Sequence, residues 1–183
     1  LIYLKKKPVY LNTDTWEGLP SWISDNAKRA IFRSIANAIT TNVLQLHAPV
    51  LVATQLQLSL RDLLDVHTIF LRAMPRYQGI VAQDCVKVLI DEDNDDGTSK
   101  KSLYFGKCVA FLQDSEGKQF VVLRWFTRHE DNGFDMISKV PSFKLAPEGH
   151  TKSFSTLPLD AIVNGALMVP GGGRFWASLA PRE

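Results

Sequence analysis

Two long apolar runs separated by a short polar turn constrain the fold of this chain more than any other feature. The runs are LYFGKCVAFLQ (residues 103–113) and KQFVVLRWF (residues 118–126), and DSEG lies between them. Runs rich in aromatic and β-branched residues, bounded by turn residues, predict a β-hairpin. Gly117 can adopt the positive φ that such a turn needs. The chain must therefore build a sheet around this hairpin.

The register of the hairpin predicts which side chains share a face. A four-residue loop would place Gln113 opposite Lys118 and Tyr104 opposite Thr127, with Trp125 on the neighbouring diagonal. Because side chains alternate along a strand, Tyr104, Trp125 and Thr127 would then lie on one face. The other face would be apolar and would form the core, with four phenylalanines: Phe105, Phe111, Phe120 and Phe126.

The segment 78–183 is predicted to be mainly β. QDCVKVLI (residues 83–90) alternates as a strand does, and LPLDAIVNGALMVP (residues 157–170) supplies a last apolar element. DEDNDDGTSKK (residues 91–101) is too charged to be buried and is predicted to be a solvated loop between two strands. The glycine triplet Gly171–Gly173 is interpreted as a flexible connector.

The segment 1–77 is predicted to be a mixed, partly helical extension that packs on this β unit. Ser24 or Asp25 can cap a helix in which Ile31, Ile35 and Ile39 recur every four residues, with Phe32, Val43 and Leu46 widening the stripe. Alternation in QLQLSL (residues 55–60) favours a strand. The expected fold class is α+β: a small, barrel-like antiparallel sheet with an N-terminal helical extension.

Composition sets outer limits on function. The chain has 183 residues, of which 45% are hydrophobic and 22% charged, as in an ordinary globular protein. No apolar run is long enough to span a membrane, so no membrane association is expected. The chain opens on Leu1, as an excised piece of a longer protein would. A net charge of +2 permits contact with nucleic acid without requiring it.

Motifs for catalysis or metal binding are missing from the sequence. An EF-hand placed on Gly97 puts Leu103 where a bidentate carboxylate is needed. The four histidines have no metal-ligand spacing, and Cys85 and Cys108 are expected to be reduced thiols. No nucleophile elbow occurs, and the glycine triplet lacks the lysine of a phosphate-binding loop. We therefore predict no enzyme, no metal and no cofactor.

The segment FGKCVAFLQDSEGKQFVVLRWFTRHED (residues 105–131) resembles the central hairpin of BAH (bromo-adjacent homology) domains, and QDCVKVLI resembles their preceding strand. The resemblance implies a nuclear, chromatin-associated module that binds a histone tail or another peptide, with methyl-lysine held in an aromatic cage. By position, Tyr104 and Trp125 match two cage aromatics, and the third falls on Thr127. Phe134 or Phe143 would have to complete such a cage. The alternative is a Trp125 that simply packs under a loop.

The stretch from residue 55 onward is also similar to the C-terminal part of KDZ-type transposases, through Arg76, Tyr77, Ala166, Leu167, Val169 and Pro170. That resemblance implies a nucleic-acid-associated domain, in which basic residues contact DNA phosphates: Lys5, Lys6, Lys7, Lys28, Arg29 and Arg33. A purely structural packing domain is the third hypothesis.

Overall fold

The computed structural model of the protein describes residues 9–12, 17–41, 50–61, 66–74, 76–77, 80–81, 83–93, 97–128 and 141–177. These residues form one α-helix, α1 (Asp25–Thr40), and two 3₁₀ turns, η1 (Thr151–Ser153) and η2 (Leu159–Ala161). The strands within the same residues are β1 (Val9–Leu11), β2 (Val50–Ala53), β3 (Gln55–Arg61), β4 (Val66–Arg72), β5 (Arg76–Tyr77), β6 (Ile80–Val81), β7 (Cys85–Asp93), β8 (Ser99–Gln113), β9 (Gln119–Arg128), β10 (Ser142–Leu145), β11 (Phe154–Pro158), β12 (Ile162–Ala166), β13 (Met168–Gly171) and β14 (Arg174–Ala177).

Helix α1 forms where the apolar spacing predicts it. Ser24, rather than Asp25, is the N-cap: its Oγ accepts a hydrogen bond from the Ala27 N–H at 3.2 Å. That bond satisfies one of the backbone donors left without an intrahelical partner. Ile31 and Ile35 are fully buried on the face that meets the sheet. Val43 and Leu46, which were expected to widen this face, lie outside the described residues. No helix among the described residues has the length and apolar character needed to cross a membrane.

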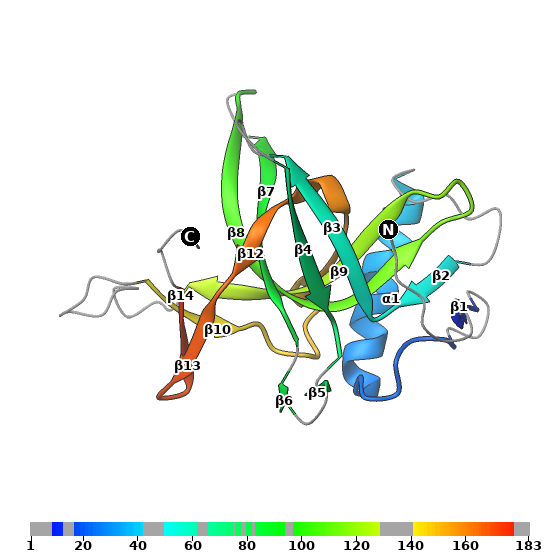
Figure 1. Ribbon diagram of the computed structural model, residues 1–183, viewed down its shortest axis with the longest axis horizontal. Coiled ribbons are helices and arrows are strands. Elements are labelled where there is room, and N and C mark those ends of the chain that lie inside the picture. Colours follow the sequence, from blue (N-terminus) through cyan, green and yellow to red (C-terminus); the bar gives the residue numbers. More distant parts are fainter. Residues whose placement is uncertain are drawn as a thin grey trace.

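The β8–β9 hairpin is the centre of a ten-stranded antiparallel sheet (Figure 1). One edge of β8 pairs with β7 and then β2, and the other edge pairs with β9. The free edge of β9 pairs with β11 and then with β10, which leads on to β14 and β13. The sheet therefore branches at both strands of the hairpin.

The α+β class and the antiparallel sheet are thus confirmed, but the described strands do not close into a barrel. The sheet branches because β8 and β9 are longer than their other partners, so that the outer edge of each pairs with two strands in succession. Chain segments before and after residue 77 share this sheet, since β2 pairs with β8. The alternation in QLQLSL correctly predicts strand β3, which pairs with β4 in a separate two-stranded hairpin.

The register of the central hairpin differs from the predicted one at the turn. Gln113 lies opposite Gln119, not Lys118, so the loop is one residue longer. A bulge at Val109 then shifts the pairing back by one residue, and Gly106 lies opposite Trp125. The two offsets cancel beyond the bulge. Tyr104 and Trp125 are therefore on one face, as predicted.

Between the bulge and the turn, the prediction for Phe111 is wrong. Val109 and Ala110 both point to the side of α1, so the alternation of β8 is inverted and Phe111 joins the face of Trp125. Phe105, Phe120 and Phe126 remain on the opposite face, as predicted.

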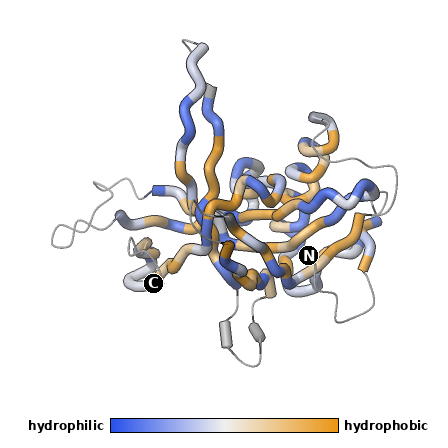
Figure 2. The backbone as a smooth tube through the Cα atoms, turned by 45° about the horizontal axis from the view of Figure 1, so that its top comes forward, coloured by the Kyte–Doolittle hydropathy of each residue, from blue (hydrophilic) through white to orange (hydrophobic). Residues whose placement is uncertain are grey.

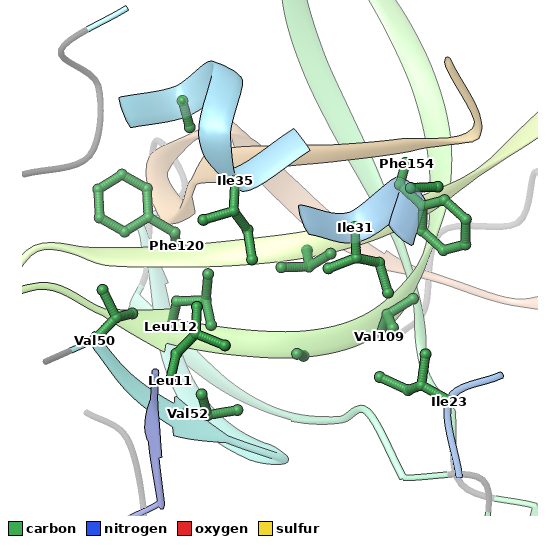
Figure 3. Packing of buried hydrophobic residues seen from close by; sticks show 14 of the residues in the cluster. Leu11, Ile23, Ile31, Ile35, Val50, Val52, Val109, Leu112, Phe120 and Phe154 are labelled. Carbon is green, nitrogen blue, oxygen red and sulfur yellow. The ribbon is translucent and has the colours of Figure 1, made fainter. Parts of the chain in front are cut away.

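Three apolar clusters fill the space around the hairpin. The first lies between α1 and the sheet, and Figure 3 shows Ile35 near Phe120 and Leu112 and Ile31 near Val109 and Phe154. The second lies on the other face, under the β3–β4 hairpin, whose Leu56 and Leu71 are buried there. The third joins Phe105 and Phe126 to β10 and the β13–β14 hairpin. The tube in Figure 2 shows that apolar stretches converge where these strands cross.

Two segments predicted to be loops belong instead to β-hairpins. Gly172 and Gly173, at φ 56° and 75°, form the two-residue turn of the β13–β14 hairpin, so the flexible-connector interpretation is wrong. Positive φ at both positions matches a type I′ turn, which follows the right-handed twist of the strands. In the acidic run, β7 extends to Asp93 and β8 starts at Ser99, so the loop is shorter than predicted. Each of the three acids in β7 is opposed by a basic or neutral partner, such as Asp91 by Lys101.

Candidate functional site

Tyr104 and Trp125 lie together at the point where β8 and β9 part. Their ring centroids are 5.9 Å apart, with an edge-to-face angle of 61°. Both residues are half-buried at the margin of the second cluster, so each packs on the core and stays partly exposed. The pair is thus neither sealed in the interior nor split between the two faces.

Gly106 lies beside this contact, directly opposite Trp125 and two residues from Tyr104 on the same face. A Cβ at this position would approach Leu123 Cδ1 to 3.0 Å, which is tighter than most real Cβ contacts. The missing side chain therefore makes room for Leu123, which packs in the second cluster together with Trp125 and Tyr104.

Hydrogen bonds hold both rings in place. The indole Nε1–H of Trp125 donates to Ser155 Oγ at 2.9 Å, from the neighbouring strand β11. The Tyr104 hydroxyl donates to Glu92 Oε1, and Ser102 Oγ donates to Glu92 Oε2 at 2.5 Å. The Glu92 carboxylate therefore lies at the edge of the aromatic pair, and it has lone pairs left to accept further hydrogen bonds.

Sequence reasoning missed Glu92, which it assigned to a solvated loop. The available signal was the length of the β7 pattern: if QDCVKVLI continues through DED, Glu92 falls on the same face as Val88 and Ile90. The register places it opposite Lys100, two residues beyond Ser102 along β8. Glu92 can reach Tyr104 because β7 continues beyond its apolar residues to Asp93.

Thr127 and Phe143, two of the other predicted cage residues, do not join this pair. Thr127 is exposed, and its Oγ1 donates to the Lys144 carbonyl at 3.3 Å. Phe143 packs edge-to-face on Phe105 at 5.1 Å, in the third cluster, on the opposite face of the sheet. Phe134 lies outside the described residues. Within the described residues, the aromatic site therefore has two rings and one carboxylate.

The basic residues predicted to contact DNA are only partly described. Lys5, Lys6 and Lys7 lie outside the described residues. On α1, Lys28 Nζ lies 3.4 Å from Asp25 Oδ1, and Arg29 Nη2 donates to Asn26 Oδ1 at 2.5 Å. Arg33 is exposed one turn further along the helix. These cations stand on the outer face of α1, away from the aromatic pair.

A second charged group lies on the face opposite the aromatic pair. Lys107 and Arg124 are cross-strand neighbours, and burial lowers the pKa of both side chains. Arg124 Nη1 contacts Glu148 Oε1 at 2.8 Å, and its Nε donates to the Ala146 carbonyl at 2.7 Å. Glu148 also accepts from Ser24 Oγ at 2.7 Å. This group ties the start of α1 to β9, which is a structural role.

The described residues contain no group of three or more histidine, cysteine or acidic side chains that could hold a metal ion. Burial raises the pKa of the Cys85 thiol to about 11 and that of Cys108 well above its ordinary value. Protonated, buried thiols are poor nucleophiles. A shallow hollow lies at the other end of the hairpin, against Lys118, Phe120 and Leu159, and does not reach the aromatic pair.

No protein-family model, curated protein or solved structure matches this chain. Aromatic ring faces beside a carboxylate favour a positively charged ligand, because the negative face of a ring and the carboxylate both attract a cation.

Proposed function

We propose that the protein is a non-catalytic interaction module that binds a cationic side chain of a peptide, a histone tail being the leading example, at Tyr104, Trp125 and Glu92. The observation that carries the proposal is the edge-to-face aromatic pair, partly exposed and hydrogen-bonded to a carboxylate. The BAH-like sequence of the hairpin is the reason for placing the module at chromatin, in the nucleus, and for naming methyl-lysine as the cation. The same proposal includes the finer fold assignment, a BAH-like arrangement of the antiparallel sheet.

The chemistry favours a methylated ammonium over an ordinary one. A trimethylammonium group keeps its charge but is more weakly hydrated, so it loses less on contact with the rings. Each well-placed ring contributes roughly 0.5–2 kcal/mol, and the pair contributes roughly 1–4 kcal/mol. A dissociation constant of about 1 mM already requires roughly 4 kcal/mol. The two rings by themselves are therefore a weak site, and the partner must make further contacts.

Calorimetric titration with histone-tail peptides, unmodified and trimethylated, tests the proposal. We expect Trp125→Ala to weaken binding of the trimethylated peptide by about tenfold or more, in line with the loss of one ring. Trp22→Ala is the matched control, because Trp22 is 41% exposed and stands before α1. It should bind as the unmodified protein does.

A neutral analogue separates charge from shape. Replacing the quaternary nitrogen of trimethyllysine by carbon leaves the volume unchanged and removes the attraction to the rings and to Glu92. Binding should fall about tenfold. If no tail peptide binds, or if Trp125→Ala binds as well as Trp22→Ala, the proposal is wrong.

A further inference from the structure

The β8 strand has an open edge next to the aromatic pair. On one side, Ser99–Lys107 is fully paired with β7. On the other side, pairing with β9 begins only at Gly106 opposite Trp125, because the rest of β9 turns toward β10. Among the described strands, none therefore pairs with that edge of β8 from Ser99 to Phe105. Figures 1 and 2 show the β7–β8 ribbon projecting from the rest of the sheet.

An open strand edge presents backbone N–H and C=O groups that a further strand can bond. A peptide strand added here would lie along β8 in line with β9, beyond the pair Gly106–Trp125 where β9 stops pairing with β8. Its first residues would lie beside Trp125, and the following ones beside Ser102 and Lys100. The further contacts that the weak aromatic site requires are thus available from the backbone of the same strand.

The two faces of this edge have different chemistry. One face carries Tyr104 and Ser102, with Glu92 behind them on β7 and Lys100 opposite Glu92 at the far end, so it is the Tyr104 end of this face that suits a cation. The other face carries Leu103 directly opposite Leu89, and these side chains are 51% and 37% exposed. Successive side chains of an added strand point to opposite faces. A residue next to the cation would therefore meet the exposed leucine pair.

We infer that the partner peptide binds as an added β-strand along Ser99–Phe105 of β8, with a cationic residue at Tyr104 and Trp125 and a directly adjacent apolar residue against Leu103 and Leu89. This inference rests on the proposed function and adds the binding mode and a sequence rule for the partner. A second copy of this chain is a poorer occupant, because Lys100 and Lys101 would approach the same residues of the other copy.

The probe is a nine-residue peptide of serine and threonine with trimethyllysine at its centre and valine on each side. In an added strand only alternate residues direct their N–H toward β8. N-methylation at one set of alternate amides should therefore weaken binding about tenfold or more, and N-methylation at the other set should change it less than about threefold. The second set is the control for the first. Amide hydrogen exchange at Ser99–Phe105 should slow when the peptide binds.

The apolar contact is tested from both partners. Replacing both valines by serine should weaken binding about tenfold, and Leu103→Ser should cause the same loss with the valine peptide but little with the serine peptide. Leu167→Ser is the matched control, because Leu167 is also 51% exposed and lies outside the ribbon. Circular dichroism checks that both variants keep the fold.

The outcomes distinguish the inference from the function on which it rests. If the probe or a histone tail binds through Trp125 but both sets of N-methylated peptides bind equally, strand addition is wrong and the proposed function stands. If a tail binds and the valine probe does not, the sequence rule and the binding mode are wrong. If no cationic peptide binds, the proposed function and the inference both fail.

Discussion

Trp125 occupies two environments at once. One part of the indole packs on the second cluster, its Nε1–H bonds to Ser155, and another part stays accessible beside Tyr104. A tryptophan suits such a boundary because it has a large apolar body and one polar donor. At the residue scale, packing and recognition therefore use the same side chain, and the hydrogen bond to Ser155 decides how it is oriented.

Ser155→Ala should loosen the indole. We expect a loss of about 1 kcal/mol in the free energy of unfolding, since one hydrogen bond is removed at a half-buried site. Affinity for trimethyllysine peptides should fall a few-fold. Denaturant unfolding and calorimetry measure the two effects.

Ser153→Ala, two residues away, is the control. The buried Ser153 hydroxyl has no hydrogen-bond partner among the described residues, so its removal should be neutral or stabilising by up to about 1 kcal/mol. Equal losses from both substitutions would contradict the role assigned to Ser155.

The two thiols predict a decline in stability at alkaline pH. Burial raises the pKa of Cys85 to about 11, above that of a thiol in the unfolded chain. As the pH rises, the thiol therefore loses its proton at a lower pH in the unfolded state than in the folded state. Its contribution to the free energy of unfolding is fully present below about pH 8.5 and decreases as the pH rises toward 11. Cys85→Ser should show a smaller decrease in the free energy of unfolding between pH 8 and 10.5 than the unmodified protein. In the native state at pH 8, both thiols should react with iodoacetamide much more slowly than in denaturant.

The bulge at Val109 is the feature of the hairpin on which the arrangement of its two faces depends. It places Val109 and Ala110 toward α1 and turns Phe111 to the other face. Deleting Val109 would restore strict alternation and move each β8 residue on one side of the deletion to the wrong face. We expect the deletion to abolish the cooperative unfolding transition. Val109→Ala keeps the bulge and should cost only about 1–2 kcal/mol, the usual loss for removing part of a buried side chain.

The β13–β14 turn requires residues that accept positive φ. Gly173→Val should cost about 1–2 kcal/mol, because a β-branched side chain is strained at φ 75°. Gly165→Ala, in β12, is the control, since a Cβ there meets nothing within 4 Å. It should leave the melting temperature nearly unchanged. If both substitutions are tolerated equally, the turn is not a type I′ hairpin.

At the scale of the whole molecule, the β8–β9 hairpin contributes side chains to all three apolar clusters. We therefore expect a single unfolding transition in which helix and sheet are lost together. Ile35→Ala in the first cluster and Val88→Ala in the second should each lower the midpoint of unfolding. For each variant, far-ultraviolet circular dichroism and tryptophan fluorescence should report the same midpoint. Separate midpoints for the two probes would show that α1 and its cluster unfold independently.

The sequence by itself determined the elements whose causes are local. Ser24 caps α1 because a hydroxyl three residues before Ala27 can reach its N–H, and Ile31 and Ile35 repeat at the helical period. The strands of the central hairpin follow from their residue types, and Gly117 marks the turn at φ 80°. The sequence also predicted that Tyr104 and Trp125 are neighbours. This holds because two register differences that were not predicted, the longer turn and the bulge at Val109, cancel.

Only the tertiary structure decided the rest. The bulge at Val109 exists because α1 packs on one face and the β3–β4 hairpin on the other, and no local pattern in β8 encodes both demands. Glu92 reaches Tyr104 because β7 and β8 stay paired as far as Asp93 and Ser99, and Phe143 is placed on the opposite face by the pairing of β10 with β9. Periodicity in a sequence reports contacts a few residues apart, whereas these positions depend on partners 12 to 38 residues away, such as Glu92 for Tyr104 and Phe143 for Phe105.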